Sequence, residues 1–463
     1  MTDRRHTLSI LDCQLRELTA AFSNALGHER AAYLFCAKAS TPSETRLIVR
    51  EVAIVPPEHI SGSSPEHVSI SSLSYVPAIC KADKFRQSLV LVHSHPTGFP
   101  HFSKQDDREE AHLFRTAFLR APNGPHGSLI LIGGNTPSII GRVWLSDEVR
   151  HPMARIRVVG RRMRLFDHVE GDHAPSLPPW TDRQVRAFGK ETQALLSRLH
   201  VGVVGNGGTG SAVADQLIRL GVGQITAIDE QALTDTNVTR VHGSGLEDTG
   251  TPKASIVKRH AEQIGTGTLV VPVQGSVCDL EVASILRDCD IIFACTDDYL
   301  GRVILNRLSV WYFIPVFDMA VIIDSDGGVI REVTGRITTL IPGNACLRCR
   351  ERIPQAKLDA QQLKRFHPEE YAARVREGYA PELGDPDPAV VMFTTGVAAR
   401  AVTEFIHMLT GFMGEHRTAT EVLERFHETE VRVNSRPGED GCYCSTPSKW
   451  GKGDERRFLD LSW

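Results

Sequence analysis

The sequence predicts an α/β protein of two domains, and two observations carry the prediction. A polar stretch with several prolines over residues 170–180 divides the chain into halves of different rhythm. Before it, β-rich apolar runs indicate an α+β domain. After it, strands alternate with a glycine-rich turn and helices, which is typical of a mostly parallel sheet covered by helices. We expect the first domain over 1–168, a linker over 169–180 and the second domain over 181–463.

Composition and charge exclude several classes of protein. Apolar residues make up 41% and charged residues 23%, which excludes a disordered or fibrous chain. With 52 basic and 56 acidic residues, the net charge of −4 argues against a nucleic-acid binder with a basic surface. No apolar run approaches the roughly 20 residues of a membrane helix, and the start lacks a signal core. We therefore expect a cytoplasmic protein.

The elements of the first half follow from hydrophobic periodicity. Apolar residues recur at helical spacing over 8–26, which predicts a helix there. Runs rich in branched residues predict the strands of a sheet, and the last of them should complete the domain. These runs cover 46–55, 88–95, 127–134 and 154–166.

A group of metal-ligand residues follows the run 88–95. His93 and His95 stand two residues apart on the predicted strand, so their side chains point to the same side. Ser103 and Asp106 follow in a short turn. Two imidazoles and one carboxylate are the ligands of a catalytic zinc site, whose fourth position is left for water. Zinc lowers the pKa of such a water towards about 7.

The whole string, H-x-H-x7-S-x2-D, resembles the signature of the JAMM (MPN/JAB) metalloproteases, which cut peptide or isopeptide bonds after ubiquitin-like modifiers. The resemblance implies that Ser103 helps to hold the oxyanion. It also implies a water-activating glutamate, for which Glu29 fits best and Glu51 is the alternative. A solvated helix-end carboxylate is the other interpretation of Glu29. The implied zinc ligands are His93, His95 and Asp106.

The second half opens on a nucleotide-binding pattern. A buried strand over 199–204 runs through Gly205, Gly207 and Gly210 into a predicted helix. These glycines let the backbone turn tightly and approach phosphates, and the helix N-terminus favours anions. Asp229 ends the next strand, where a carboxylate can hold ribose hydroxyls. These features alone fit any enzyme that binds NAD or FAD.

Polar residues further along favour a triphosphate over NAD. This set contains more cationic groups than the binding of NAD requires. Such groups suit a triphosphate whose α-phosphate is attacked while pyrophosphate leaves. Asp297, at the end of the strand 290–297, is placed to hold Mg²⁺. The other residues of this set are Asn237, Arg240, Lys253, Arg302 and Asn306.

This order of residues resembles the ThiF/MoeB and ubiquitin-activating-enzyme superfamily over roughly 178–445, which implies a Rossmann-like adenylation domain. The resemblance implies Asp229 as the ribose ligand and Asp297 as the Mg²⁺-linked catalytic aspartate. Arg183, in the string WTDRQ, is implied as an arginine finger given to the partner's ATP across a homodimer interface. Arg183, Arg302 and Asn306 would otherwise be ordinary helix residues. The implied phosphate binders are Asn237, Arg240 and Lys253.

Two close pairs of cysteines indicate a structural zinc site. Cys346 and Cys349 form a CxxC pair, and Cys442 and Cys444 form a CxC pair. Four thiolates satisfy tetrahedral zinc. The superfamily uses two CxxC pairs, so the CxC pair is a departure. The alternative is a redox CxxC, whose usual βαβ context is missing.

The resemblance breaks at the cysteine that carries a thioester in some activating enzymes. Residues 350–441 contain no cysteine, and the aligned segment ends in Thr394 and Thr395. The two threonines would otherwise be ordinary residues at the start of a helix. Activation would therefore end at the acyl adenylate, pass to an oxyester on a hydroxyl, or use a thiol from elsewhere. The charged stretch 351–385 predicts a helical insertion that forms a crossover loop or contacts a partner.

We therefore expect a bifunctional enzyme of a bacterial-type ubiquitin-like pathway. The second half would use ATP and Mg²⁺ to adenylate the C-terminus of a ubiquitin-like modifier, and the first half would use zinc to trim or remove that modifier. Expected partners are the modifier, a conjugating enzyme and a second copy of the chain, with neither nucleic acid nor membrane. The main alternative is a sulfur-carrier activating enzyme with a carrier-processing protease. A non-catalytic adaptor and an NAD-dependent enzyme are further alternatives.

Overall fold

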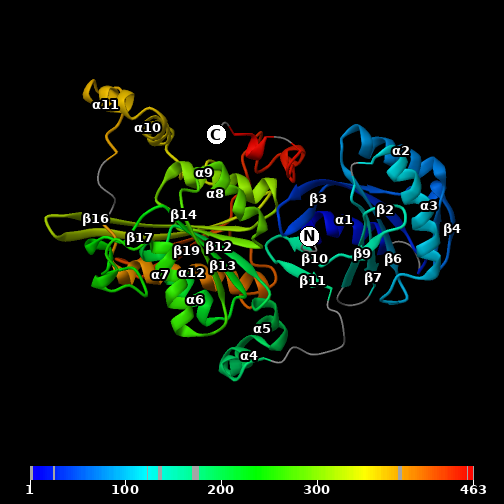
Figure 1. Cartoon of the computed structure of the whole chain (residues 1–463), viewed down its shortest axis with the longest axis horizontal. Coiled ribbons are helices and arrows are strands. Elements are labelled where there is room, and N and C mark those ends of the chain that lie inside the picture. The colour runs from blue at the N-terminus through cyan, green and yellow to red at the C-terminus, as the bar shows by residue number, and fades with distance from the viewer. Residues whose placement is uncertain are drawn as a thin grey trace. The chain divides into compact units, whose positions relative to one another are not determined.

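The computed structural model describes residues 4–23, 27–122, 124–133, 138–168, 177–383, 388–455, 457–461 and 463. Two compact units make up the chain (Figure 1). The first comprises 1–173, 311–313 and 447–461, and the second comprises 174–310, 314–446 and 462–463. Residues 169–176 of the expected linker lie outside the described residues. Among the described helices, none has the length and apolar character to cross a membrane.

The first unit is built on a mixed sheet of nine strands, in the order β11-β10-β1-β3-β2-β6-β7-β8-β9. A two-stranded sheet pairs β4 with β5. The strands are β1 (Arg5–Leu11), β2 (Ala31–Ser40), β3 (Glu44–Ile54), β4 (Ile60–Ser63), β5 (Val68–Ile70), β6 (Ser88–His95), β7 (His126–Ile132), β8 (Ser138–Trp144), β9 (Arg150–Pro152), β10 (Arg155–Val159) and β11 (Arg164–Asp167).

Helices cover both faces of this sheet, so its central strands are apolar on both sides. Helix α1 (Asp12–Ser23) packs on one face, and α2 (Ser72–Lys84) and α3 (Lys104–Arg120) pack on the other. Strand β2 shows the alternation, because Leu34 belongs to the core under α1 and Tyr33 to the core under α2 and α3. The expected α+β character of this half is confirmed.

The predicted helix over 8–26 is wrong at its start. Residues Arg5–Leu11 form β1, an inner strand paired in parallel with β3 and β10. Leu8 and Ile10 are buried on the same face of the sheet, a period of two that also fits the helical pattern over so short a run. The helix begins at Asp12, whose carboxylate suits the first helical turn. Residues 24–26 lie outside the described part of the chain.

The second unit contains a sheet of eight strands, in the order β14-β13-β12-β15-β16-β17-β18-β19. The first five strands in this order are parallel and the rest are antiparallel, which confirms the mostly parallel, Rossmann-like sheet. The strands are β12 (His200–Val204), β13 (Gln224–Asp229), β14 (Leu269–Gln274), β15 (Ile291–Ala294), β16 (Val316–Asp326), β17 (Val329–Leu340), β18 (Glu421–Arg425) and β19 (Glu430–Asn434).

Helices accompany these strands, and the first turn of α6 follows the glycine-rich loop. Helix α12 packs against α6 and against β16 and β17. The helices are α4 (Asp182–Phe188), α5 (Lys190–Leu196), α6 (Gly208–Arg219), α7 (Lys253–Ile264), α8 (Leu280–Ile285), α9 (Tyr299–Trp311), α10 (Gln355–Phe366), α11 (Pro368–Arg376) and α12 (Val391–Thr410).

The charged insertion is helical, as predicted, over α10 and α11 (Figure 1). Two side chains of α10 hold it to the rest of the second unit. The amide oxygen of Gln361 accepts a hydrogen bond from the backbone N–H of Tyr299 at 2.8 Å. Arg365 donates to Asp279 at 2.6 Å. The insertion is thereby attached at the start of α9, directly after the strand-end aspartates, and at the N-cap residue of α8.

The C-terminal segment 447–461 returns to the first unit. Arg50 of β3 forms an ion pair with Glu455 at 2.7 Å. The Asp454 carboxylate accepts hydrogen bonds from the backbone N–H of Ser40 at 2.7 Å and from the Tyr312 hydroxyl at 2.9 Å. The first unit is therefore assembled from three separate pieces of the chain.

Candidate functional sites

Two histidines and an aspartate converge at the end of β6. His93 and His95 are buried there, and their Nε2 atoms lie 3.1 Å apart. The Asp106 carboxylate lies 3.3 Å from His93 Nε2 and 3.7 Å from His95 Nε2. Because the strand alternates, both rings leave it on the same side, as the sequence predicts.

The first turn of α3 sets the orientation of Asp106. Ser103 is the N-cap residue, and its hydroxyl oxygen accepts a hydrogen bond from the backbone N–H of Asp106 at 3.1 Å. In return, the Asp106 carboxylate accepts from the backbone N–H of Ser103 at 2.6 Å. Burial raises the pKa of Asp106, but hydrogen bonds from His93 and His95 outweigh it and hold that pKa well below its ordinary range. The oxyanion contact of Ser103 stays a prediction.

Glu29 completes this cluster from the segment before β2. The residue is 1% exposed, and one carboxylate oxygen lies 3.7 Å from His95 Nε2. Its other oxygen, Oε2, is buried and has no hydrogen-bond partner among the described residues. Burial raises the pKa of Glu29 to about 7, and the two histidines act against this rise. Glu51, the alternative, lies on β3 and is half-exposed in an ion pair with Lys81, so it does not join the cluster.

The donor set of this cluster fits a zinc ion. Glu29, His93 and His95 each offer a ligand atom within 4.8 Å of the others. The Nδ1 atom of His95 lies 2.8 Å from the backbone carbonyl oxygen of Phe99, which orients the ring and leaves Nε2 facing the cluster. The buried Oε2 atom of Glu29 would gain a partner from a zinc-bound water. We call these residues the histidine cluster: Glu29, His93, His95 and Asp106.

A buried ion network beside the histidine cluster was not predicted from the sequence. Arg142 of β8 contacts Glu110 at 2.8 Å and Asp107 at 2.6 Å, both on α3. Its guanidinium also stacks 3.9 Å from the ring centroid of Phe102, which in turn packs edge-on against His93. The sequence offered one signal, the acidic residue directly after Asp106. Arg142 therefore fixes the part of α3 that presents Asp106.

In the second unit, the glycines of the loop after β12 have separate roles. Gly205 has φ +85°, and a Cβ there would lie 2.8 Å from the backbone of Cys295. A Cβ on Gly210 would lie 1.7 Å from the carbonyl oxygen of Gly205. Gly207 is the N-cap of α6, and a Cβ there would meet nothing within 4 Å. Two glycines thus allow the turn, and the third leaves space at the helix N-terminus, where anions bind.

Asp229, Lys253 and Asp297 gather beside this loop. The Asp229 carboxylate accepts hydrogen bonds from the backbone N–H groups of Asn206 at 2.6 Å and Gln231 at 2.8 Å. The Lys253 ammonium is nearly buried and donates to the side chain of Gln231 at 2.8 Å. Burial raises the pKa of Asp229, with Lys253 acting against this rise and Asp297 adding to it. The three residues therefore interact electrostatically.

Two further predicted phosphate binders lie on the segment after β13. The aliphatic part of Arg240 lies against Gly208, since a Cβ built on that glycine would be 3.2 Å from Arg240 Cδ. The Arg240 guanidinium donates to the backbone carbonyl of Thr236 at 2.9 Å. Asn237 ends a short 3₁₀ turn, and its carbonyl accepts from the backbone N–H of Arg240 at 3.0 Å. Arg240 thus lies at the glycine-rich loop.

The remaining predicted residues of the second unit lie elsewhere. Arg302 donates to the backbone carbonyls of Thr296 at 3.1 Å and Met319 at 3.3 Å, so it braces the loop that carries Asp297. Asn306 donates to the Tyr443 hydroxyl, on the side of the cysteine pairs. Arg183 is exposed on α4.

The four cysteines predicted to bind zinc come together. The sulfur of Cys346 lies 3.6 Å from that of Cys349 and 3.7 Å from that of Cys442, and Cys349 lies 3.6 Å from Cys444. A disulfide would need about 2.05 Å. Tetrahedral zinc, with Zn–S bonds of about 2.3 Å, spaces its thiolates about 3.8 Å apart. The backbone N–H of Glu439 also donates to Cys349 at 3.4 Å. This set fits a structural zinc ion.

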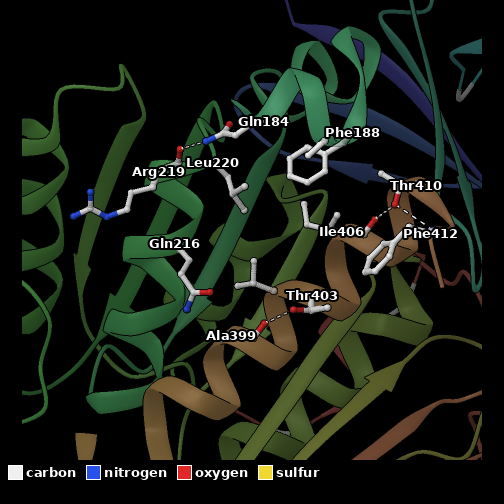
Figure 2. Close-up of a pocket in the computed structure, with 12 residues that line it drawn as sticks. Gln184, Phe188, Gln216, Arg219, Leu220, Ala399, Thr403, Ile406, Thr410 and Phe412 are labelled. Carbon is white, nitrogen blue, oxygen red and sulfur yellow. Dashed lines mark hydrogen bonds between the residues drawn. The ribbon is translucent and has the colours of Figure 1, made fainter. Parts of the chain in front are cut away.

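A mostly apolar pocket of about 620 Å³ also lies in the second unit, among α4, α6 and α12. Figure 2 shows Phe188, Leu220, Ile406 and Phe412 around it, and Gln184 donating to the backbone carbonyl of Arg219. No motif in the sequence indicated this pocket, since its residues are ordinary helix-packing types spread over three elements.

Comparisons with known proteins match both halves of the chain. The model of the ThiF family matches residues 181–444, and the model of the prokaryotic homologs of the JAB domain matches residues 14–146. The SAMP-activating enzyme E1 of Haloferax volcanii is 29% identical over 161 residues, which is 35% of this chain and 56% of that protein. The molybdopterin-synthase adenylyltransferase of Escherichia coli is 28% identical over 176 residues, which is 37% of this chain and 67% of that protein.

The matched stretch thus spans about half the length of the first of these relatives. Among solved structures, E. coli MccB with ATP is 16% identical and covers 57% of this chain and 74% of its own, with a TM-score of 0.44.

Proposed function

The chain belongs to the ThiF family, and on that premise we propose that its second unit adenylates the C-terminal carboxylate of a ubiquitin-like modifier. The observation that carries the proposal is the group formed by the glycine-rich loop, Asp229, Lys253 and Asp297. A modifier carboxylate attacks the α-phosphorus of ATP, and pyrophosphate leaves. The space at Gly207 and the N-terminus of α6 accept the phosphates, and the Lys253 ammonium offsets their charge.

The other residues of this group orient the nucleotide. Asp229 holds the loop through Asn206 and would accept hydrogen bonds from the ribose hydroxyls. Asp297 is the residue that would hold Mg²⁺, which would supply positive charge to offset that of the triphosphate. Arg240 flanks the phosphates at Gly208.

ATP–pyrophosphate exchange in the full chain, measured with modifier proteins that end in glycine, tests this proposal. We expect exchange that depends on the modifier, and its loss by at least a hundredfold in Lys253→Ala and Asp297→Asn. Lys258→Ala, at an exposed position of the same helix as Lys253, is the matched control and should keep full exchange. Exchange that persists in Lys253→Ala, or that needs no modifier, would contradict the proposal.

For the first unit, we propose zinc-dependent hydrolysis of the bond after the modifier's C-terminal residue. The gathering of Glu29, His93 and His95, the Asp106 carboxylate beside both imidazoles and the unpartnered oxygen of Glu29 support it. His93, His95 and Asp106 would hold the ion, which supplies an activated water when bound. The Glu29 carboxylate would accept a proton from the attacking water and donate it to the leaving amine.

Two variants separate metal binding from hydrolysis. His95→Ala should lose one of two zinc equivalents by elemental analysis, since the four cysteines keep theirs, and should lose cleavage of a modifier fusion. Glu29→Gln should keep zinc and still lose cleavage by at least a hundredfold, because the amide cannot take a proton. Cleavage that survives in Glu29→Gln would remove Glu29 from the mechanism. Cleavage that survives after zinc removal would overturn the proposal for the unit.

A sulfur-carrier activating enzyme is the second candidate function. The relative named a molybdopterin-synthase adenylyltransferase favours it, whereas the relative named a SAMP-activating enzyme E1 favours activation of a modifier. The fate of the adenylate separates the two. Transfer to a conjugating enzyme or to a lysine of a target favours protein modification. A thiocarboxylate on the modifier favours sulfur transfer.

A further inference from the structure

Thr395 differs from the other threonines of α12 in the partner of its hydroxyl. Thr394, Thr403 and Thr410 each donate to a backbone carbonyl one turn earlier in the helix, and Figure 2 shows two of these bonds. Such back-bonding is the usual state of a helical threonine. The Thr395 hydroxyl instead lies 3.0 Å from Nε2 of His242. Both residues are half-buried, so small parts of each reach solvent.

This hydroxyl–imidazole pair is attached to the glycine-rich loop. The backbone N–H of His242 donates to the Ser211 hydroxyl at 3.0 Å, and that hydroxyl donates to the carbonyl of Gly207 at 2.7 Å. On the other side, Thr394 is buried against Gly208, since a Cβ built there would lie 3.1 Å from its hydroxyl oxygen. Both members of the pair are thus held by the first turn of α6, where the phosphates of an adenylate would lie.

The thiols near Asp297 are poorly suited to accept an acyl group. Cys278 is buried and donates to Asp298 at 3.1 Å, and Cys295 packs against Gly205 and Gly210. Burial raises the pKa of both thiols, which disfavours the reactive thiolate. A hydroxyl, by contrast, needs only an adjacent base at the moment of attack, and an imidazole is the commonest such base.

We propose that Thr395, with His242 as general base, accepts the modifier's acyl group from the adenylate as an oxyester. The Thr395 oxygen bonds to the acyl carbon, the bond from that carbon to the phosphate oxygen breaks, and AMP leaves. The hydroxyl proton passes to Nε2 of His242. The proposal rests on the adenylation proposed above and answers what becomes of its product.

A preformed adenylate tests this step without the adenylation that precedes it. Full-length Glu29→Gln protein is mixed with N-acetyl-glycylglycyl-AMP, which mimics a modifier tail, and followed by intact mass spectrometry. We expect one acetyl-glycylglycyl adduct that resists thiols, is released by hydroxylamine, and maps to the peptide that contains Thr395.

Variants at three positions make the result specific. Thr395→Val should lose the adduct, Thr395→Ser should keep it, and His242→Asn should slow its formation by about a hundredfold. Thr403→Val is the matched control, because the Thr403 hydroxyl donates to the backbone carbonyl of Ala399 in the same helix, and it should keep the adduct. Unchanged melting temperatures would show that each variant is folded.

An adduct that persists in Thr395→Val, a thiol-labile adduct on a cysteine, or no hydroxylamine-labile adduct on the parent protein would each overturn the proposal. ATP–pyrophosphate exchange is measured on the same preparations. Normal exchange without the adduct would leave the adenylation proposal standing and remove Thr395 alone.

Discussion

Glu44 is a buried carboxylate whose charge supports the fold of the first unit. It accepts from Arg157 at 2.8 Å and from Arg46 at 3.2 Å, with side chains 2–3% exposed. Burial alone would raise the pKa of Glu44, but the two guanidinium groups hold it well below the ordinary range. A carboxyl with a lowered folded pKa stabilises the fold above its unfolded pKa of about 4.3, and this contribution is lost as the pH falls through the folded pKa.

Replacing Glu44 by Gln should therefore lower the free energy of unfolding by about 3 kcal/mol at pH 7, because two guanidinium groups lose their partner. The difference from the parent protein should narrow as the pH falls below about 4. Calorimetric unfolding of the full chain at pH 7 and at about pH 3 measures both. Glu51→Gln, which breaks a half-exposed pair with Lys81, is the control and should cost less than about 1 kcal/mol. A gap that widens in acid would contradict the argument.

Arg142 should act on metal binding without touching the metal. It fixes α3 through Glu110 and Asp107 and packs on Phe102, which contacts His93. We expect Arg142→Met to weaken zinc binding by roughly 10–100-fold in a chelator competition. Arg150 pairs with Oδ2 of Asp107, lies over the ring of Trp144 and is more exposed, so Arg150→Met should leave the affinity unchanged. Equal effects of both variants would mean that Asp107, and not the buried network, matters.

At the residue scale, the spacing of residues was sufficient to predict a site where its ligands stand close together in the sequence. His93 and His95 could be placed because strand alternation fixes their common side, and the cysteine pairs because each is a chelate in itself. Asn306 could not be placed, since a helix has several faces and its partner, Tyr443, is far away in the sequence. Arg142 was missed for the same reason, because its partners lie on another element.

At the scale of elements, the turn from β12 into α6 requires glycine at particular positions. Gly210→Ala would put a Cβ 1.7 Å from a backbone oxygen, so the turn must shift. We expect this variant to lose the thermal shift that ATP gives and to be destabilised by about 1–3 kcal/mol. A Cβ at Gly207 has no atom within 4 Å, so Gly207→Ala should have the melting temperature of the parent protein. It should bind ATP less tightly, because the added methyl group would occupy the space that the phosphates need. Wild-type ATP binding by Gly210→Ala would show that the loop is not the phosphate site.

The element that sequence reasoning misjudged shows where periodicity fails. Residues 8–11 were predicted to be helical because a short apolar run fits periods of both two and 3.6. Only the neighbours β3 and β10, contributed by distant segments, select the strand. The alternation of strands and helices after residue 199 had no such ambiguity. There the glycine-rich turn marks where the strand period of two changes to the helical period of 3.6.

At the scale of the whole molecule, the return of 447–461 to the first unit could not be read from the sequence. The segment carries no motif, and its contacts with Arg50 and Ser40 join residues some 400 positions apart. Family motifs placed the two chemistries in order along the chain but gave no information on which unit the end of the chain completes.

The last prediction concerns the expected homodimer, in which Arg183 of one copy would contact the ATP bound by the other copy. Arg183 is exposed on α4, and Lys253 is nearly buried beside the glycine-rich loop. Arg183→Ala and Lys253→Ala should each lose modifier-dependent ATP–pyrophosphate exchange by at least tenfold. When the two variants are mixed and allowed to exchange subunits, each mixed dimer regains one complete site, made of an intact Lys253 and the other copy's Arg183. About a quarter of the parent activity should then return, since half the dimers are mixed and each has one working site.

Arg186→Ala, on the same helix but paired with Asp182, is the control and should stay active. Loss in Arg183→Ala that mixing does not restore would place Arg183 in its own copy's site and contradict the shared arrangement.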